Sequence, residues 1–368
     1  MDTNALYYQL GLYFVYGVGN INAKKLVAYC GGVKEVFETK KKDLIRIPGI
    51  GEKIVSDLLS FNNWDWVEEE IKFIEKNNIR PLFYLDHDFP AKLKQFEDGP
   101  IMLFAKGNFN LNPEKTIAIV GTRNATDYGK MQTEKLVADL VPHNPTIISG
   151  LAFGIDITAH KASMDNGLET WGIMGNGLHT VYPAIHKKYV EKMLEKGGVF
   201  SEFNAGVKPD RENFPQRNRI VAALADAVVV VEAADRGGAL ITAELANDYS
   251  RDVFAFPGRI NDEFSRGCNR LIKQNKASLI ESVSDIEYML GWARDKKNEK
   301  PAQISMFYDL TEEEDKLISI FKDNGASNID VICNKMEMTQ GKVSAILLNL
   351  ELNGIIRSLP GKMYDLNK

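Results

Sequence analysis

Residues that could hold a phosphate follow an apolar run in the segment AIVGTRNATDYGK, residues 118–130. Glycine lets backbone amides approach phosphate oxygens, and the planar guanidinium of Arg123 pairs well with phosphate. The segment has neither the G-x-G-x-x-G spacing of a dinucleotide site nor the G-x-x-x-x-G-K-[ST] spacing of a P-loop. We therefore expect Gly121, Thr122 and Arg123 to hold the phosphate of another kind of ligand.

Three further loops of the same character follow predicted strands: SGLAFGID at 149–156, GNGLHTVYP at 175–183 and EAADRGGALITAE at 232–244. The carboxyl ends of parallel strands meet at one edge of a sheet, where ligands of such sheets bind. Four glycine-rich loops at one edge predict a site for a polyanion. The residues that we expect to contact phosphate there are Ser149, Gly150, Gly154, Gly175, Asn176, Gly237 and Gly238.

The segment NFPQRNRIVAAL, residues 213–224, adds positive charge. Asn213 can cap a helix, and Pro215 suits the first helical turn. This start places Arg217, Asn218 and Arg219 at the positive end of the helix dipole, where an anion is favoured. We expect all three residues to contact phosphate.

The two arginines of this segment lie about 200° apart on a helix of 3.6 residues per turn. Arg217 is on the sheet-facing side, so we expect it to line the site. Arg219 has two interpretations: it reaches a second phosphate, or it pairs with an acid such as Asp226 or Glu232. Phe214 could stack on a base, as aromatic residues do in single-strand binders, or pack in the core.

A basic run continues further along the chain without an intervening acid. It comprises Arg266, Arg270, Lys273 and Lys276. The first three could extend a nucleic-acid groove, although a solvated helix face would show the same pattern.

Catalytic arrangements are poor. Asp156 and His160 are four residues apart, but we expect the carboxylate to bond to its loop and the imidazole to pack within the helix layer. The chain has no G-x-S-x-G nucleophile motif, and Glu202, Glu232 and Glu244 are scattered. We predict no catalytic residue, no metal site and no cofactor.

The elements that would position these residues alternate between apolar strands and helices. Near-continuous apolar runs such as AVVVV are typical of parallel strands buried on both faces. The pattern predicts an extended, Rossmann-like, doubly wound α/β domain over residues 113–292 with a mainly parallel sheet. The predicted strands are Thr116–Val120, Thr146–Ser149, Thr170–Met174, Gly198–Phe200, Ala227–Val231, Val253–Phe256 and Ser278–Ile280.

Two smaller domains flank this one. Residues 1–75 predict an all-helical domain, in which VYGVGNINAKKLVAYCGG and IPGIGEKIVSDLLS resemble helix-hairpin-helix motifs that approach DNA phosphates. A helical packing domain with glycine turns is the alternative. We expect a connector at 76–112, a charged linker at 293–309 and a winged-helix-like domain at 310–368.

Bulk properties narrow the class of protein. The chain has 368 residues, 44% of them hydrophobic, and a net charge of −5, which excludes a uniformly basic nucleic-acid coat but not a local basic groove. Its three cysteines are widely spaced and suit a reducing cytoplasm. The first ten residues lack the basic start of a signal peptide, and we expect no membrane span.

The motifs VGTR, SGLAFGID, GNGL, FPQRNR, VVVVEA and GGALITA occur in an order that resembles the DNA-processing protein A family, also called DprA or Smf. The resemblance covers residues 116–286 and extends to both flanking domains. It implies an extended Rossmann fold that binds and protects single-stranded DNA, dimerises, and helps to load the RecA recombinase in natural transformation. Phe153 departs from the family, since many relatives have a basic residue in this loop.

Two other functions compete with this interpretation. The first is a nucleoside-monophosphate phosphoribohydrolase of the lysine-decarboxylase-like group, because RGGALITAE keeps the paired glycines and the glutamate of that group's motif. The motif's proline and third glycine are missing here. The second is an adaptor whose winged helix binds duplex DNA, which the acidic start TEEED and the few basic residues of 338–350 disfavour.

Overall fold

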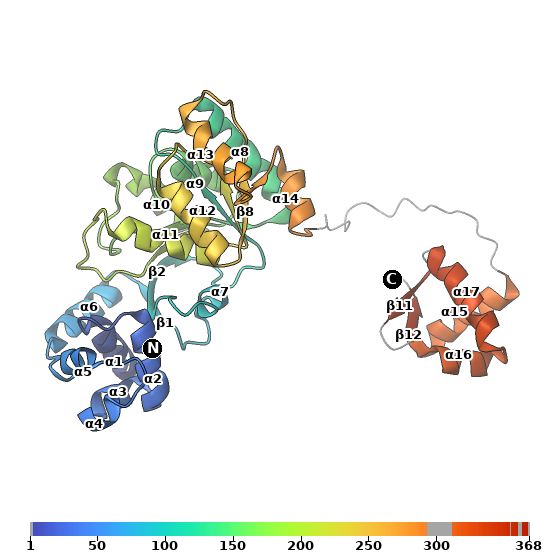
Figure 1. Ribbon diagram of the computed structural model, residues 1–368, viewed down its shortest axis with the longest axis horizontal. Coiled ribbons are helices and arrows are strands. Elements are labelled where there is room, and N and C mark those ends of the chain that lie inside the picture. Colours follow the sequence, from blue (N-terminus) through green and yellow to red (C-terminus); the bar gives the residue numbers. More distant parts are fainter. Residues whose placement is uncertain (1–2, 293–310, 354, 360–362, 367–368) are drawn as a thin grey trace. The chain divides into compact units, whose positions relative to one another are not determined.

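The computed structural model describes residues 3–292, 311–353, 355–359 and 363–366. The chain divides into two compact units, Met1–Arg294 and Asp295–Lys368 (Figure 1). The predicted linker, 293–309, lies outside the described residues.

A nine-stranded sheet forms the centre of the first unit, in the order β1-β2-β6-β5-β4-β3-β7-β8-β9. The seven strands from β6 to β9 in this order pair in parallel, whereas β1 and β2 are antiparallel. The predicted doubly wound α/β fold is therefore confirmed, and each predicted strand is present to within one residue. The strands are β1 Arg80–Phe83, β2 Met102–Asn108, β3 Thr116–Val120, β4 Thr146–Ser149, β5 Thr170–Ile173, β6 Gly197–Ser201, β7 Ala227–Val230, β8 Asp252–Ala255 and β9 Ser278–Leu279.

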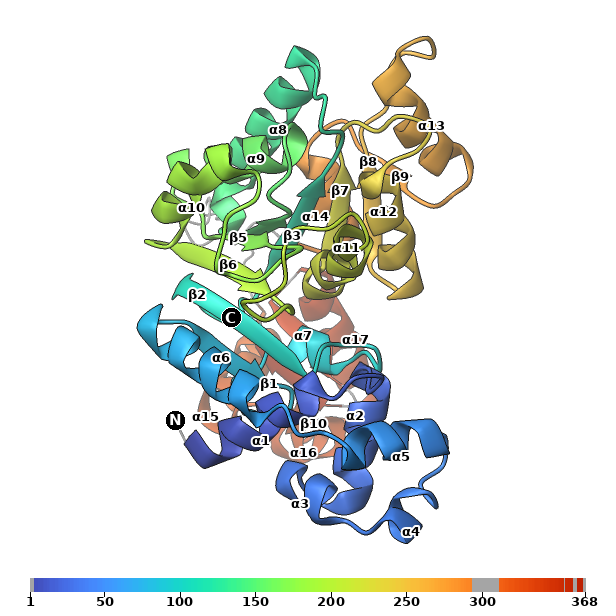
Figure 2. The same ribbon diagram turned by 90° about the vertical axis from the view of Figure 1, so that its left-hand side faces the viewer.

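Helices cover both faces of the parallel part of the sheet (Figure 2). On one face, α8, α9 and α14 pack on residues such as Ile117 and Val229, and α10 covers β5 and β6. On the other face, α11, α12 and α13 pack on residues such as Ala118 and Val228. The helices are α8 Asp127–Leu140, α9 Ile155–Asp165, α10 Lys187–Met193, α11 Asn213–Leu224, α12 Gly238–Asp248, α13 Arg266–Lys273 and α14 Val283–Met289, with short 3-10 turns at Val141–His143, Ala184–His186 and Glu263–Ser265.

The stretch predicted as a connector, 76–112, instead extends the sheet with β1 and β2 and carries the short helix α7, Ala91–Lys94. Side chains alternate between the faces of a strand. In β2, Leu103 and Ala105 join the core of the α/β domain, whereas Met102 and Phe104 join the core of the N-terminal helices. The N-terminal helices therefore share one compact unit with the α/β domain.

The N-terminal helices pack on a buried, mainly aliphatic core, and a group of half-buried aromatic rings packs against it. The rings of Tyr7 and Trp64 stack with centroids 4.8 Å apart, and a Cβ at Gly11 would lie 2.7 Å from the Trp64 ring. Gly17 and Gly49 have φ of +77° and +82°, a left-handed conformation that suits glycine, in the turns before α2 and α5. The helices are α1 Thr3–Phe14, α2 Asn20–Cys30, α3 Val33–Glu38, α4 Lys41–Leu44, α5 Glu52–Leu59 and α6 Trp64–Lys76.

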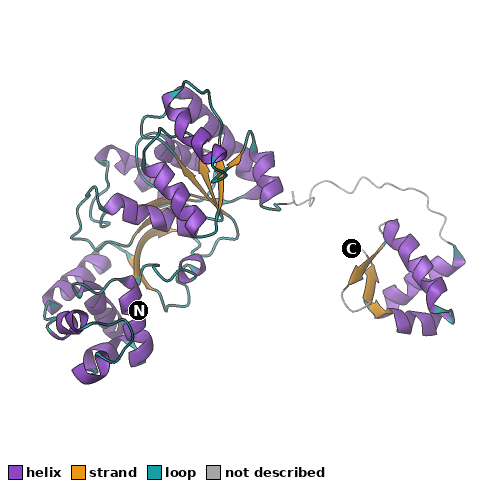
Figure 3. Ribbon diagram, viewed as in Figure 1, coloured by secondary structure: helices purple, strands orange, loops and turns teal. Residues whose placement is uncertain are grey.

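Among its described residues, the second unit has three helices and a small sheet of order β10-β12-β11 (Figure 3), as expected for the predicted winged-helix-like domain. A capping box of Thr311 and Glu314 begins its first helix. Val343 and Leu347 are buried in its core. The elements are α15 Glu312–Asn324, β10 Ser327–Asn328, α16 Ile329–Met336, α17 Gln340–Leu352, β11 Ile356–Leu359 and β12 Met363–Leu366.

Candidate nucleic-acid interface

A groove of about 800 Å³ lies at the carboxyl ends of the parallel strands. The loops after β3, β4, β5 and β7 line it, together with the loop between β6 and α11 and the first turns of α11 and α12. The structure brings together here nine of the residues predicted from sequence. They are Gly121, Thr122, Arg123, Gly150, Phe214, Arg217, Asn218, Gly237 and Gly238.

The half-buried Phe214 ring stands at the centre of a cationic cluster. The guanidinium carbons of Arg123 and Arg217 lie 5.3 and 6.0 Å from its centroid, within cation–π range. The Tyr182 ring lies 6.0 Å away at an angle of 31°. A Cβ at Gly175 would lie 2.8 Å from the Phe214 ring, so this glycine makes room for the aromatic side chain. Whether Phe214 also stacks on a base stays a prediction.

Arg217 lines the groove but is only 6% exposed. Its guanidinium donates to the Ile173 carbonyl oxygen, and its Nε donates to the Asn218 side-chain oxygen at 3.2 Å. A Cβ at Gly150 would lie 2.5 Å from both Arg217 Nη1 and Asp156 Oδ2, so the glycine lets the two opposite charges flank it. Burial raises the pKa of the Asp156 carboxyl above its usual range, although the Arg217 charge opposes the shift. Arg217 therefore anchors the groove floor.

Three of the predicted loops support one another. The Ile155 amide donates to the Thr122 carbonyl oxygen at 3.3 Å, and the Thr122 amide donates to the Glu232 carbonyl oxygen at 2.8 Å. Gly154 has a φ of +77°, and a Cβ there would lie 2.7 Å from the Arg123 carbonyl carbon. Gly154 thus lets the backbone of Thr122 and Arg123 pass close by, although it does not line the groove itself.

Ser149 and Asn176 do not line this groove. Both residues are buried, and the Ser149 hydroxyl donates to the Ile119 carbonyl oxygen at 2.6 Å. The Asn176 amide nitrogen donates to the carbonyl oxygens of Gly177 and Thr180, each at 2.8 Å. These side chains shape the strand ends instead of facing the ligand side.

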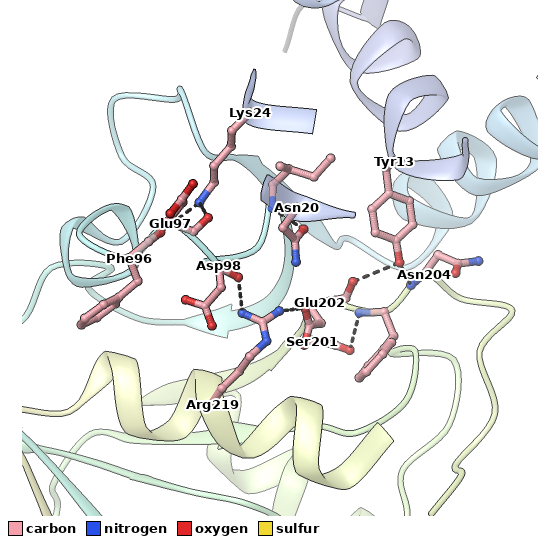
Figure 4. A network of polar contacts seen from close by, with 12 residues as sticks. Tyr13, Asn20, Lys24, Phe96, Glu97, Asp98, Ser201, Glu202, Asn204 and Arg219 are labelled. Atoms are coloured by element: carbon pink, nitrogen blue, oxygen red, sulfur yellow. Dashed lines mark hydrogen bonds and ion pairs between the residues drawn. The ribbon is translucent and has the colours of Figure 1, made fainter. Parts of the chain in front are cut away.

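Arg219 points away from the groove, as its 200° separation from Arg217 indicates. Its guanidinium binds the Glu202 carboxylate and donates to the Asp98 carbonyl oxygen at 2.7 Å (Figure 4). The expectation of a second phosphate contact is therefore not supported by its position, and neither of the two acids expected as partners pairs with it. Asp226 pairs with Lys92 at 2.6 Å, and the Glu232 carboxylate accepts from the Thr126 amide at 2.9 Å.

The basic residues of α13 also lie outside the lining of this groove. Arg266 and Arg270 each pair with Asp235, at 3.7 and 3.9 Å, and Arg270 donates to the Asp235 carbonyl oxygen at 2.6 Å. Lys273 is exposed on the same helix. A groove extension along α13 is not part of the observed cavity, and an acid from the β7–α12 loop pairs with its two arginines.

Two groove arginines were missed from the sequence: Arg211 and Arg236. Both are exposed and line the groove, so that with Arg123 three exposed guanidinium groups surround it. Arg236 directly precedes Gly237 in a loop that was recognised, and its position was the available signal. Arg211 had no such signal, because only the tertiary course of the β6–α11 loop brings it to the groove.

The candidate acid–base pair from the sequence, Asp156 and His160, is not free for catalysis in the groove. His160 is buried, with its ring nitrogens 2.6 Å from the Gly150 carbonyl oxygen and 2.7 Å from the Thr170 hydroxyl. Burial lowers the pKa of His160 to about 4, so the ring is neutral near pH 7. The packing role predicted for it is confirmed. Glu244 lies outside the groove lining and pairs with Lys276 at 3.2 Å, which counts against the phosphoribohydrolase alternative.

Within the described ranges, no three His, Cys, Asp or Glu residues gather closely enough to hold a metal ion. Within the same ranges, no helix has the length and apolar character needed to cross a membrane.

Comparison with known proteins agrees with the resemblance. Residues 80–291 match the family described as DNA recombination-mediator protein A, and residues 308–362 match the DprA winged helix domain. Protein Smf of Synechocystis is 31% identical over 95% of this chain and 96% of its own length. The X-ray structure of DprA from Streptococcus pneumoniae has a TM-score of 0.66 and 33% identity over 77% of this chain and 97% of that one.

A second solved structure concerns the single-stranded DNA binding mode of DNA processing protein A from Helicobacter pylori. It has a TM-score of 0.53 and 28% identity over 58% of this chain and 96% of that one.

Proposed function

The chain belongs to the DNA recombination-mediator protein A family, and we propose that it binds single-stranded DNA in the groove at the strand ends. The observation that carries the proposal is the set of three exposed arginines, Arg123, Arg211 and Arg236, around that groove. Guanidinium groups form two-point contacts with phosphate, which suits a repeating polyanion. The DNA-binding relative from Helicobacter pylori supports the same ligand.

The groove also offers surfaces for bases. Phe214 and Tyr182 lie beside the exposed Arg123, and alternating cations and aromatic rings are typical of single-strand sites. Because the net charge of the chain is −5, this local arrangement, and not the overall charge, would attract the strand. We propose binding without turnover, since the acid and base candidates Asp156 and His160 are buried in structural contacts.

The wider role that we propose follows from the family. The protein protects incoming single-stranded DNA in the cytoplasm, acts as a homodimer, and helps to load the RecA recombinase during natural transformation. Family membership supports this role, and the groove supports the DNA-binding step alone.

Fluorescence anisotropy with labelled oligo-dT tests the DNA-binding step. Each lost charge-assisted contact costs about 1–3 kcal/mol, so Arg123→Ala and Arg236→Ala should each weaken binding about 5- to 150-fold. The binding constant should also depend less on salt: the slope of log K against log salt concentration should become shallower by about 0.7 for each lost phosphate contact. Arg80→Ala is the matched control, because Arg80, on the edge strand β1, is also exposed but pairs with Asp88 away from the groove lining.

Two results would contradict this proposal. One is wild-type affinity in both groove variants, and the other is equal weakening by Arg80→Ala. If the folded wild type bound no oligonucleotide, release of ribose 5-phosphate from AMP would be the next assay, because the groove would then hold a smaller phosphate ester.

A further inference from the structure

We propose that Tyr13 and Glu70, in the N-terminal helices, are positioning residues for the DNA groove. They hold the near end of the loop between β6 and α11, here called the wall loop and comprising residues 202–212. The far end of the wall loop forms one side of the groove. This inference rests on the proposed function, because it assigns the N-terminal helices a part in presenting the DNA-binding surface.

The wall loop connects the end of strand β6 in the sheet to the start of helix α11, which covers one face of the sheet. It leaves the sheet after Ser201 and enters α11 at Asn213. Its last part, including Pro209, Asp210 and Arg211, lines the groove. Exposed Arg211 is one of the three cations proposed to meet phosphate, so the conformation of the wall loop decides where that cation stands.

The hydroxyl group of Tyr13 in α1 makes two hydrogen bonds to the first part of the wall loop, one as donor and one as acceptor. The hydroxyl donates to the Glu202 carbonyl oxygen at 3.0 Å and accepts from the Asn204 amide at 3.0 Å. Figure 4 shows the ring reaching from its helix to these two residues. The ring also packs edge-on against Phe104 of β2, with centroids 5.9 Å apart. Packing therefore fixes the ring, and the hydroxyl fixes the loop.

Glu70 of α6 holds the next residue. Its two carboxylate oxygens accept from the Ala205 amide at 3.0 and 3.2 Å. Glu70 is only 6% exposed, and burial raises the pKa of its carboxyl while the Ala205 amide opposes the shift. The Val207 amide then closes a turn onto the Asn204 carbonyl oxygen at 3.1 Å. The anchored part thus ends shortly before the groove wall begins.

A second connection fixes the helix that follows the wall loop. Arg219 of α11 binds the Glu202 carboxylate and the Asp98 carbonyl oxygen. Lys24 of α2 donates to the neighbouring carbonyl oxygens of Phe96 and Glu97, each at 3.0 Å. Because α11 also carries Phe214 and Arg217, the N-terminal layer is connected to both ends of the groove wall.

Releasing the wall loop would leave the groove chemically complete but less ordered before DNA binds. A loop that must be ordered on binding lowers affinity, because its conformational entropy is then lost in the binding step. Tyr13→Phe removes both hydrogen bonds to the loop while keeping the packed ring. We therefore expect it to weaken oligo-dT binding about 3- to 10-fold, in line with the loss of one or two hydrogen bonds.

Matched controls separate this effect from general damage. Tyr7→Phe makes the same chemical change in the same helix, where the ring stacks on Trp64. Glu70→Ala should also weaken binding, and Glu69→Ala is its control, because Glu69 is exposed on the same helix. Both glutamate variants remove one negative charge, so a difference between them reports the Ala205 contact and not charge. The controls should bind within about twofold of wild type.

A double-mutant cycle with Arg211→Ala shows whether Tyr13→Phe weakens DNA binding through the position of Arg211. If Tyr13 acts by positioning the Arg211 side of the groove, Tyr13→Phe should cost less than about twofold when Arg211 is already alanine. A loss of fold stability alone would weaken binding equally in both backgrounds. Thermal unfolding of each variant checks folding, and Tyr13→Phe decides the question if Glu70→Ala does not fold.

The outcomes are distinct. Absence of oligo-dT binding by wild type would overturn the proposed function. Wild-type binding that is lost in Arg123→Ala but unchanged in Tyr13→Phe and Glu70→Ala would overturn only this inference. Equal weakening by Tyr13→Phe in both Arg211 backgrounds would overturn it as well.

Discussion

At Gly154 the backbone conformation and the space around the residue both require glycine. Its φ is +77°, and a Cβ there would lie 2.7 Å from the Arg123 carbonyl carbon and closer still to the Thr122 carbonyl oxygen. Gly167, at the other end of the same helix, has a φ of +69° but nothing within 4 Å of its would-be Cβ. Gly154 also has a ψ of −125°, outside the left-handed helical region, so Gly167 serves as the reference for a positive φ in open space.

The magnitudes follow from these two environments. Gly167→Ala should cost about 1–2 kcal/mol of unfolding free energy, the usual penalty for a left-handed alanine. Gly154→Ala should cost a further 1–3 kcal/mol or so, because the obstructing atoms are backbone and overpacking has about that cost. The extra loss corresponds to a melting temperature lower by roughly 2–12 °C for a domain of this size class. Gly154→Ala should also weaken oligo-dT binding, since Arg123 stands on the displaced segment.

Thermal unfolding and anisotropy on the two variants test this reasoning together. Equal melting temperatures for Gly154→Ala and Gly167→Ala would refute the steric argument. Lower stability with unchanged DNA affinity would refute the link from Gly154 to the position of Arg123.

Two further predictions concern buried charge. Arg219→Ala leaves the Glu202 carboxylate, 10% exposed, without its cation, so chemical denaturation should show a loss of about 3–5 kcal/mol, and recovery in Arg219→Lys would identify the charge as the cause. An undiminished stability would show that the pair is unimportant. The pKa of His160 is about 4 in the fold, below its unfolded value, so its contribution is complete above about pH 6.5 and is lost as the pH falls towards 4. The unfolding free energy should therefore change less between these two pH values in His160→Gln than in wild type. An equal change in the two proteins would contradict the assignment.

Local patterns predicted most of the α/β domain because its strands are short, apolar and buried on both faces. The five residues Thr116–Val120 are all buried, as a near-continuous apolar run indicates. Helical periodicity also separated Arg217 from Arg219 correctly, since the two side chains lie on different sides of α11. These results depend on geometry within one element.

Features that depend on distant partners were not accessible in the same way. The residues 101–105 form a short apolar run, but nothing local shows that β2 pairs with β6, whose residues are almost a hundred positions later. Ser149 and Asn176 have residue types that suit phosphate, yet nearby carbonyl oxygens take their hydrogen bonds. Arg211 reaches the groove through the tertiary course of the wall loop, whose near end binds Tyr13 and Glu70.

The central claim is that single-stranded DNA lies along the groove at the strand ends, and crosslinking tests it most directly. Wild-type protein would be irradiated with an oligonucleotide that carries photoreactive thymidine, and the attached peptides would be identified by mass spectrometry. The account predicts attachment within the groove segments 121–124, 209–218 and 233–238 and at Tyr182, with competition by unlabelled oligo-dT. Attachment confined to the helix starts of α2 and α5, or to the winged-helix unit, would contradict it.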